Sequence, residues 1–243
     1  HDIMRKNLLI AFFFIVFGGT AIGQLQKSQI PTSKVPLPAH HYMPEYTFDV
    51  PVDSAQWTKQ KPGLNVSFGS TDELYFRSEV PQVKQTTSLE QTAWKGERVN
   101  AQILVWSPDT LDQVRFKLSD LTNGKGQSLS KKNLQLNMIR YVLSNFPYGA
   151  TAADCGAGPR DTAYLMPDRF ETFDRFELPG RSVRPVWLQL DIPANTPAGE
   201  YNGTIEILSE NNKNPIKLNL KVKVQNQLLP KPTDWKYRLD IWQ

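Results

Sequence analysis

The stretch Ile216-Lys-Leu-Asn-Leu-Lys-Val-Lys-Val224 decides the fold class of this chain. Its apolar side chains occupy every second position, and lysine or asparagine fills each position between them. A strict period of two is the pattern of a β-strand with one face buried and the other in water. The same alternation recurs in four other stretches: 99–106, 114–119, 186–192 and 201–207.

Turn residues separate these strands, at Lys95-Gly96, Ser107–Asp109, Asn123–Gly126, Pro197–Gly199 and 210–214. Helical periodicity is almost absent. Short strands joined by turns predict an all-β fold, an antiparallel β-sandwich of the immunoglobulin-like or jelly-roll-like kind. Residues 148–180 break the rhythm, and we expect a long loop there. Loops of that length are usually functional, flexible or part of an interface.

The first 23 residues have the pattern of a secretory signal peptide. Basic Arg5 and Lys6 precede an apolar run from Leu8 to Phe17, and small residues follow up to Gly23. The run is about half of the roughly 20 residues that a membrane span needs. We therefore expect an exported protein, periplasmic or extracellular, with no stable membrane span after cleavage. Residues 1–3 precede Met4 and read as upstream translation or a cloning remnant.

The remaining chain divides into three predicted parts. Residues 24–52 contain five prolines and predict an extended arm. Residues 53–227 hold the sandwich, and 228–243 read as a linker followed by the first strand of a domain that is missing here. The net charge is +4 with dispersed lysines, so we expect no nucleic-acid partner. The single cysteine, Cys155, excludes an internal disulfide.

The residues of this chain do not assemble a credible catalytic, cofactor or metal site. His40 and His41 lie in the proline-rich arm, where no rigid imidazole is expected. Cys155 has no neighbouring histidine to activate it. Six carboxylates lie between 154 and 177, interleaved with arginines, and salt-bridged loop charges explain them better than a glycosidase acid pair does. They are Asp154, Asp161, Asp168, Glu171, Asp174 and Glu177.

Two tryptophans fall on the polar side of their predicted strands. Trp106 lies opposite Val99, Ala101, Ile103 and Val105, and Trp187 lies beside Gln189 and Asp191. Such a ring packs against a second sheet or domain, or stacks on a sugar. Packing is the favoured interpretation, and Trp187 stays a candidate for sugar contact.

Several segments resemble glycoside hydrolase family 123. The segment Val186–Thr204 is similar to a strand, turn and strand of carbohydrate-active sandwich modules. Residues 228–243, ending Leu239-Asp-Ile-Trp-Gln243, resemble the crossing into the catalytic barrel of that family. Cys155–Asp161 is similar to a Cys-Gly…Arg-Pro-Asp loop, with an altered order around its proline and arginine. Phe68–Asp72 and Trp94–Glu97 fit the family's early strands, so the resemblance runs from about Trp57 to Gln243.

The resemblance implies a division of labour. The family contains exo-acting β-N-acetylgalactosaminidases in which the substrate's own acetamido oxygen attacks the anomeric carbon, assisted by an Asp-Glu pair of the barrel. That pair would lie beyond Gln243, so no catalytic residue is carried over. Asp240 and Trp242 match the barrel's first strand and join Trp187 as candidate substrate-binding residues.

The sequence leaves three functional hypotheses. The leading one is a non-catalytic sandwich that braces the catalytic barrel of an exported glycosidase acting on N-acetylgalactosamine-containing glycans, and that borders its substrate cleft. The others are a stand-alone carbohydrate-binding module and a structural cell-surface domain, because a sandwich fold hosts all three.

Overall fold

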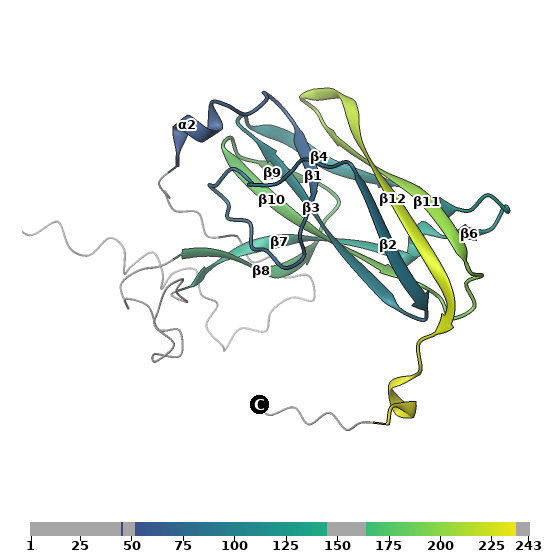
Figure 1. Ribbon diagram of the computed structural model, residues 1–243. Helices are drawn as coiled ribbons and strands as arrows, with labels where there is room; N and C mark the ends of the chain where they lie inside the picture. Colours follow the sequence, from purple (N-terminus) through teal and green to yellow (C-terminus); the bar gives the residue numbers. More distant parts are fainter. Residues whose placement is uncertain (1–44, 46–51, 145–163, 237–243) are drawn as a thin grey trace, which may run out of the picture. The chain divides into compact units, whose positions relative to one another are not determined.

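The computed structural model describes residues 45, 52–144 and 164–236, which form two β-sheets packed face to face (Figure 1). Among these residues no helix is long and apolar enough to cross a membrane. The strands are β1 (Asn65–Gly69), β2 (Ser88–Lys95), β3 (Arg98–Ser107), β4 (Leu111–Leu118), β5 (Leu121–Thr122), β6 (Ser128–Leu129), β7 (Leu134–Ser144), β8 (Tyr164–Thr172), β9 (Phe176–Leu178), β10 (Ser182–Asp191), β11 (Gly199–Ser209) and β12 (Asn212–Leu228). The short helices are α2 (Ser54–Trp57), η1 (Lys131–Asn133) and η3 (Pro232–Asp234).

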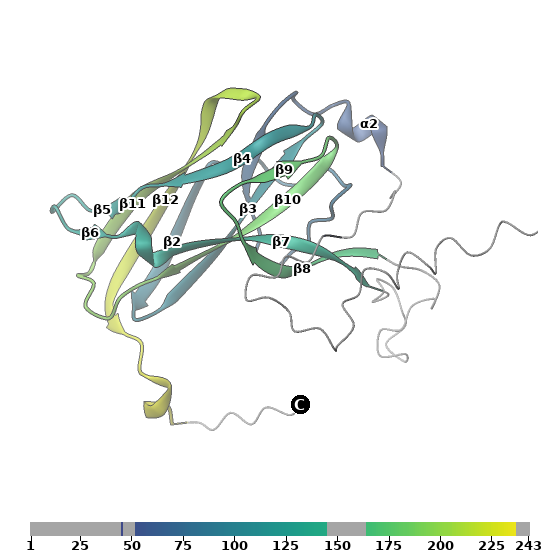
Figure 2. The same ribbon diagram turned by 180° about the vertical axis from the view of Figure 1, so that it is seen from behind.

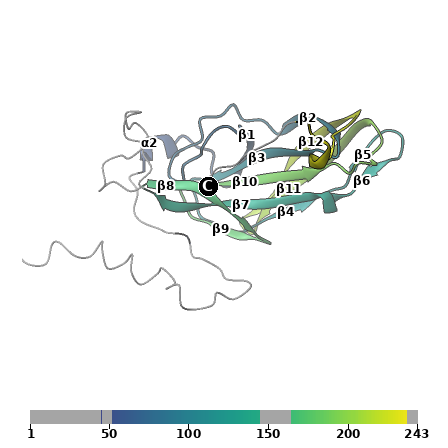
Figure 3. The same ribbon diagram turned by 90° about the horizontal axis from the view of Figure 1, so that it is seen from below.

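The five-stranded sheet has the order β1-β3-β10-β7-β8, and β3, β10 and β7 run side by side in Figure 3. The second sheet has the order β2-β12-β11-β4-β9, with β5 beside β11 and β6 beside β5. The β5–β6 hairpin and α2 lie at opposite ends of the sandwich (Figures 1 and 2). The predicted sandwich is confirmed. One pairing departs from the expected antiparallel pattern, because β12 and β2 run parallel.

The main core fills the space between the two sheets, and the period-two stretches supply it. Every apolar residue that alternation assigned to the inner face of β12 is buried except Ile216, which is partly buried. Opposite them, the central strand β10 contributes Val186, Leu188 and Leu190, which pair with β3 on one side and β7 on the other. The alternation therefore predicted which side of each of these strands faces the core.

A second apolar cluster covers one end of the outer face of the five-stranded sheet. Leu104 and Trp106 project there from β3, on the side opposite to Ile103 and Val105. Residues from α2 and the segment after β1 pack over them, and the cluster comprises Trp57, Tyr75, Val80, Leu104, Trp106 and Val183. The Trp106 indole N–H donates to Gln60 Oε1 at 3.0 Å. Trp106 therefore packs inside the protein, as favoured, but its partners are α2 and the segment after β1 and not a second sheet or domain.

The expectation of a loop throughout 148–180 is wrong for its second half. Tyr164–Thr172 forms the edge strand β8, and Phe176–Leu178 forms β9. Alternation is hidden because the register with β7 shifts, with Arg169 opposite Arg140 but Pro167 opposite Tyr141, so Asp168 is an extra residue. A proline is tolerated on an edge strand, where one side of the backbone has no partner strand. Residues 145–163 lie outside the described part of the chain.

Two neighbouring residues on β11 test which face of that strand is buried in the core and which is exposed to water. Ile205 is buried in the core, whereas Glu206 faces outward and pairs with Lys217 at 3.1 Å. We predict that Ile205→Ala lowers the free energy of unfolding by about 3 kcal/mol, through lost burial and a residual cavity. Glu206→Ala should cost less than about 1 kcal/mol. Urea denaturation measures both, and equal losses would contradict the assignment.

Candidate functional surfaces

Two arginines occupy core-facing positions at one end of the five-stranded sheet. Arg184 lies two residues before Val186 on β10, and Arg140 lies two residues after Met138 on β7. The last pair between these strands is Val186 with Met138. Pro185, which precedes Val186 on β10, has no backbone N–H to donate. The side chains of Arg184 and Arg140 are only 5% and 8% exposed. Buried charges of this kind require partners.

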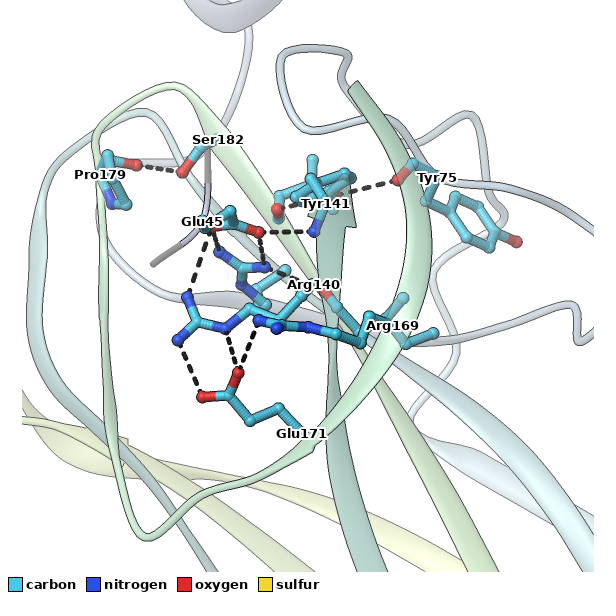
Figure 4. Close-up of polar contacts among 11 residues, drawn as sticks. Glu45, Tyr75, Arg140, Tyr141, Arg169, Glu171, Pro179 and Ser182 are labelled. Atoms are coloured by element: carbon cyan, nitrogen blue, oxygen red, sulfur yellow. Dashed lines mark hydrogen bonds and ion pairs between the residues drawn. The ribbon is translucent and has the colours of Figure 1, made fainter. Parts of the chain in front are cut away.

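Two glutamates neutralise these arginines (Figure 4). Glu45, itself 8% exposed, accepts from Arg184 Nη1 at 2.6 Å and from the Tyr141 backbone N–H at 2.7 Å. Glu171 on β8 binds Arg140 in a bidentate manner, with Nε–Oε2 at 3.0 Å and Nη2–Oε1 at 2.9 Å. Arg169 also donates to Glu171, at 3.0 Å. We call these five residues the arginine–glutamate cluster: Glu45, Arg140, Arg169, Glu171 and Arg184.

The arginines lower the pKa of Glu45, one member of the cluster. Burial by itself would raise the pKa of Glu45, but the hydrogen bonds and positive charge of Arg184, with smaller contributions from the Tyr141 N–H and Arg140, lower it overall. Burial also strongly raises the pKa of the Tyr141 hydroxyl, which lies within hydrogen-bond distance of the Tyr75 and Val183 carbonyl oxygens. A general acid needs a raised carboxyl pKa. Glu45 is therefore suited to holding charge, which is a structural task.

Trp187 lies on the outer face of the same sheet, away from the second apolar cluster. Its ring is partly exposed and approaches Phe170 of β8, with ring centroids 5.7 Å apart and planes inclined by 30°. The Phe170 side chain is 51% exposed. The Trp187 indole N–H donates to Asn100 Oδ1 at 3.2 Å. The two rings therefore form an open aromatic plate that spans strand β7.

Amide side chains surround this plate. Register places Gln102, Trp187, Asn137 and Thr172 in one row across four strands. A second row contains Asn100, Gln189 and Gln135. Gln135 donates to Asn137 at 3.3 Å, and Asn137 donates to Gln189 at 3.4 Å. We call the residues of this face the amide–aromatic face: Asn100, Gln102, Gln135, Asn137, Phe170, Thr172, Trp187 and Gln189.

A third surface lies at the end of the sandwich where β2 and β12 finish. Trp94, Leu228 and Trp235 are 44%, 57% and 39% exposed there. The strand ends are held together, because Leu228 is in register with Lys95 and the Leu229 N–H donates to the Lys95 carbonyl oxygen at 2.8 Å. The Trp235 indole N–H donates to the Pro230 carbonyl oxygen at 3.0 Å. We call Trp94, Leu228 and Trp235 the exit surface.

The structure describes only some of the residues singled out from the sequence. Trp187 is on the outer face, as predicted, whereas Asp240 and Trp242 lie outside the described residues, together with Cys155, His40, His41, Asp154 and Asp161. Glu171 is salt-bridged, as predicted for that group of carboxylates. Within the described ranges, no three His, Cys, Asp or Glu side chains gather closely enough to hold a metal ion. The sequence interpretation missed Glu45, Arg140 and Arg184.

Comparison with known proteins relates the sandwich to one protein family. The model of the glycoside hydrolase 123 N-terminal domain matches residues 68–209. A family 123 glycoside hydrolase from Clostridium perfringens, described as hydrolysing glycolipid glycans, has a similar structure, with a TM-score of 0.63 and 23% identity over 70% of this chain. This chain covers 28% of that protein. No curated protein matches.

Other solved structures are less similar. The N-terminal domain of PorA has a TM-score of 0.34 and 11% identity, with coverage of 67% of this chain and 98% of that one. The CooA pilin subunit of enterotoxigenic Escherichia coli has a TM-score of 0.33 and 13% identity, with the same two coverages.

The lowered pKa of Glu45 makes stability depend on pH. A carboxyl whose pKa is lower in the folded state stabilises the protein fully above the unfolded-state pKa, about 4.3, and that stabilisation is lost as pH falls through the folded value. We predict that Glu45→Gln lowers the free energy of unfolding at pH 7 by about 3 kcal/mol, because Arg184 loses its counter-charge. It should also flatten the acid limb of the stability curve.

Asp191→Asn is the matched control for this prediction. Asp191 also pairs with an arginine, Arg98, at 2.6 Å, but both side chains are more than half exposed. Its loss should therefore cost less than about 1 kcal/mol. Chemical denaturation between pH 3 and pH 7 measures both variants. An unchanged acid limb in Glu45→Gln would disprove the role given to Glu45.

Proposed function

Because residues 68–209 match its model, this chain belongs to the glycoside hydrolase 123 N-terminal domain family, and from that premise we propose that it is the non-catalytic sandwich of an exported glycoside hydrolase. The enzyme would act on N-acetylgalactosamine-containing glycans. The family match over most of the sandwich is the observation that carries the proposal. The catalytic residues would lie in a barrel that follows in the same protein, in accord with the 28% of the Clostridium perfringens enzyme that this chain covers.

The contacts of Glu45 and Glu171 support a non-catalytic role. Hydrolysis of a glycoside needs acids that reach the substrate, one of them able to give up a proton. Glu45 and Glu171 are instead engaged by arginines, and the pKa of Glu45 is lowered. Their chemistry is that of a structural anchor at the end of the sheet.

The exit surface supports a bracing role. Large apolar side chains that stay exposed at one end of a domain are typical of a contact with another domain. Trp94 and Leu228 lie at the ends of two paired strands, so a domain joined after residue 236 would meet a rigid platform. Hydrogen bonds hold that platform, from the Gly96 N–H to the Ile192 carbonyl oxygen at 2.8 Å and from Lys95 Nζ to Asn226 Oδ1 at 2.8 Å.

The substrate class and the export rest on different support. The substrate follows from the family resemblance and from the glycolipid-glycan hydrolysis described for the Clostridium perfringens enzyme. Export follows from the signal-like residues 1–23, which lie outside the described part of the chain. A secreted location agrees with access to glycans outside the cytoplasm.

The decisive experiment combines sequence and activity. The coding sequence beyond Gln243 should encode a barrel with adjacent Asp and Glu residues. The longer protein should release N-acetylgalactosamine from a chromogenic β-glycoside, and the 243-residue chain should release none. A stop codon directly after Gln243, or hydrolysis by the short chain, would contradict the proposal.

The exit surface generates a separate prediction for the 243-residue chain. We predict that Trp94→Ser combined with Leu228→Ser reduces self-association measured by light scattering, because exposed apolar surface drives association. The matched control is Phe170→Ser, which removes an exposed ring from a different face. An equal decrease in both variants would show that the exit surface has no special role.

A further inference from the structure

We propose that the amide–aromatic face is a binding surface for a neutral glycan. This inference goes beyond the bracing role, because the residues that carry it all lie within the sandwich and need no second domain. Four strands contribute to the face: β3, β10, β7 and β8.

The aromatic plate supplies the apolar contact. Trp187 is partly exposed and Phe170 is half exposed, and their rings lie 5.7 Å apart with planes inclined by 30°. Aromatic side chains bring a large apolar area with little conformational freedom to lose on binding. The C–H face of a pyranose ring is flat and apolar, whereas its edge carries hydroxyl groups. A plate of two partly exposed rings matches such a ligand.

The amides supply the polar contacts. Gln102 and Asn137 are buried, and Gln102 donates to the carbonyl oxygens of Ser70 and Glu73. The accessible carboxamides are those of Asn100, Gln135 and Gln189. Each carboxamide has a carbonyl acceptor and two N–H donors, and a sugar hydroxyl both donates and accepts. Asn100 is exposed and already orients the Trp187 ring at 3.2 Å. The hydrogen bonds from Gln135 to Asn137 and from Asn137 to Gln189 link the two rows and orient Gln135 and Gln189 before any ligand binds. A surface held in this way loses less entropy on binding.

The absence of charge on this face selects a neutral ligand. None of its eight residues is ionisable. At the end of the same strands, the charges of Arg98 and Asp191 are paired with each other at 2.6 Å. Glu171 of β8 faces the other side of the sheet, where it binds Arg140. An anionic polysaccharide or an acidic peptide would find no cation among the residues of the face to offset its desolvation.

A groove on the other sheet is a weaker candidate for the same ligand. It has a volume of about 830 Å³ and is lined by parts of β2, β5, β11 and β12. Its lining contains charged Glu90, Asp120 and Lys221 and no aromatic ring. Lys221 pairs there with Glu90 at 3.5 Å and with Glu200 at 3.3 Å. Without a flat apolar contact, this groove lacks the feature that favours a pyranose.

Calorimetric titration of the full chain tests the proposal. The probes are a neutral tetrasaccharide ending in β-linked N-acetylgalactosamine, a neutral galactose-ended tetrasaccharide, and the sialylated form of the first. We expect at least one neutral probe to bind and the sialylated form to bind more weakly. Trp187→Ala should weaken neutral binding about tenfold, as for truncation of a central aromatic contact.

Two further variants keep the test decisive. Phe170→Ala removes a half-exposed ring and so spares the core, and it should also weaken binding. Trp94→Ala, an exposed tryptophan at the exit surface, should leave binding unchanged. An unchanged urea midpoint verifies that each variant is folded. The proposal is overturned if the folded chain binds no neutral probe, or if Trp94→Ala weakens binding as much as Trp187→Ala does.

The barrel-containing protein separates this proposal from the bracing role. If Trp187→Ala destabilises that longer protein but leaves glycan binding intact, the face is a domain interface and the proposal is wrong. If the coding sequence shows no barrel while the short chain still binds the glycan, the bracing role fails and this proposal stands.

Discussion

The central constraint in this protein is that strand β10 lies in the middle of a five-stranded sheet. Its side chains alternate between the core side and the outer side, and each side must suit its surroundings. Its inner side chains, Val186, Leu188 and Leu190, meet the second sheet. Among the residues that the structure describes, its outer side is covered at one end, where Val183 packs under the segment that carries Tyr75 and Val80. At the other end Trp187 stays partly exposed on an amide-rich surface that none of the described segments covers. The division of β10 into covered and uncovered halves thus determines where a ligand has access.

The arginine–glutamate cluster compensates two buried positive charges that follow from the same strand geometry. Continuing the alternation of β10 and β7 past their last pair places Arg184 and Arg140 on the core side. Glu45, from a segment far away in sequence, neutralises one of them, and Glu171 on the edge strand neutralises the other. Charge pairing at this end therefore replaces apolar packing and binds Glu45 to the sheet. Replacing a whole buried ion pair by apolar residues is often neutral, whereas removing one partner is strongly destabilising.

Much of the sandwich could be predicted from the sequence, because alternation in 99–106, 186–192 and 216–224 reports directly which face is buried. Alternation could not reveal β8, where a register shift and Pro167 interrupt the period. It also could not identify Arg140 and Arg184 as core-facing, because charged residues are normally read as solvent-exposed. The position of Trp187 was predictable, but its partner Phe170 was not, since a third strand separates them.

The parallel pairing of β2 with β12 has a consequence for biosynthesis. Ser88–Lys95 bonds to a strand more than 100 residues later in the chain, so β2 has no partner on this edge until Leu228 has been made. Contacts of such long range form slowly, and an unpaired edge strand is prone to non-native association. During translation the nascent sandwich therefore stays open until its last strand emerges from the ribosome, which makes that interval the period when chaperone protection matters most.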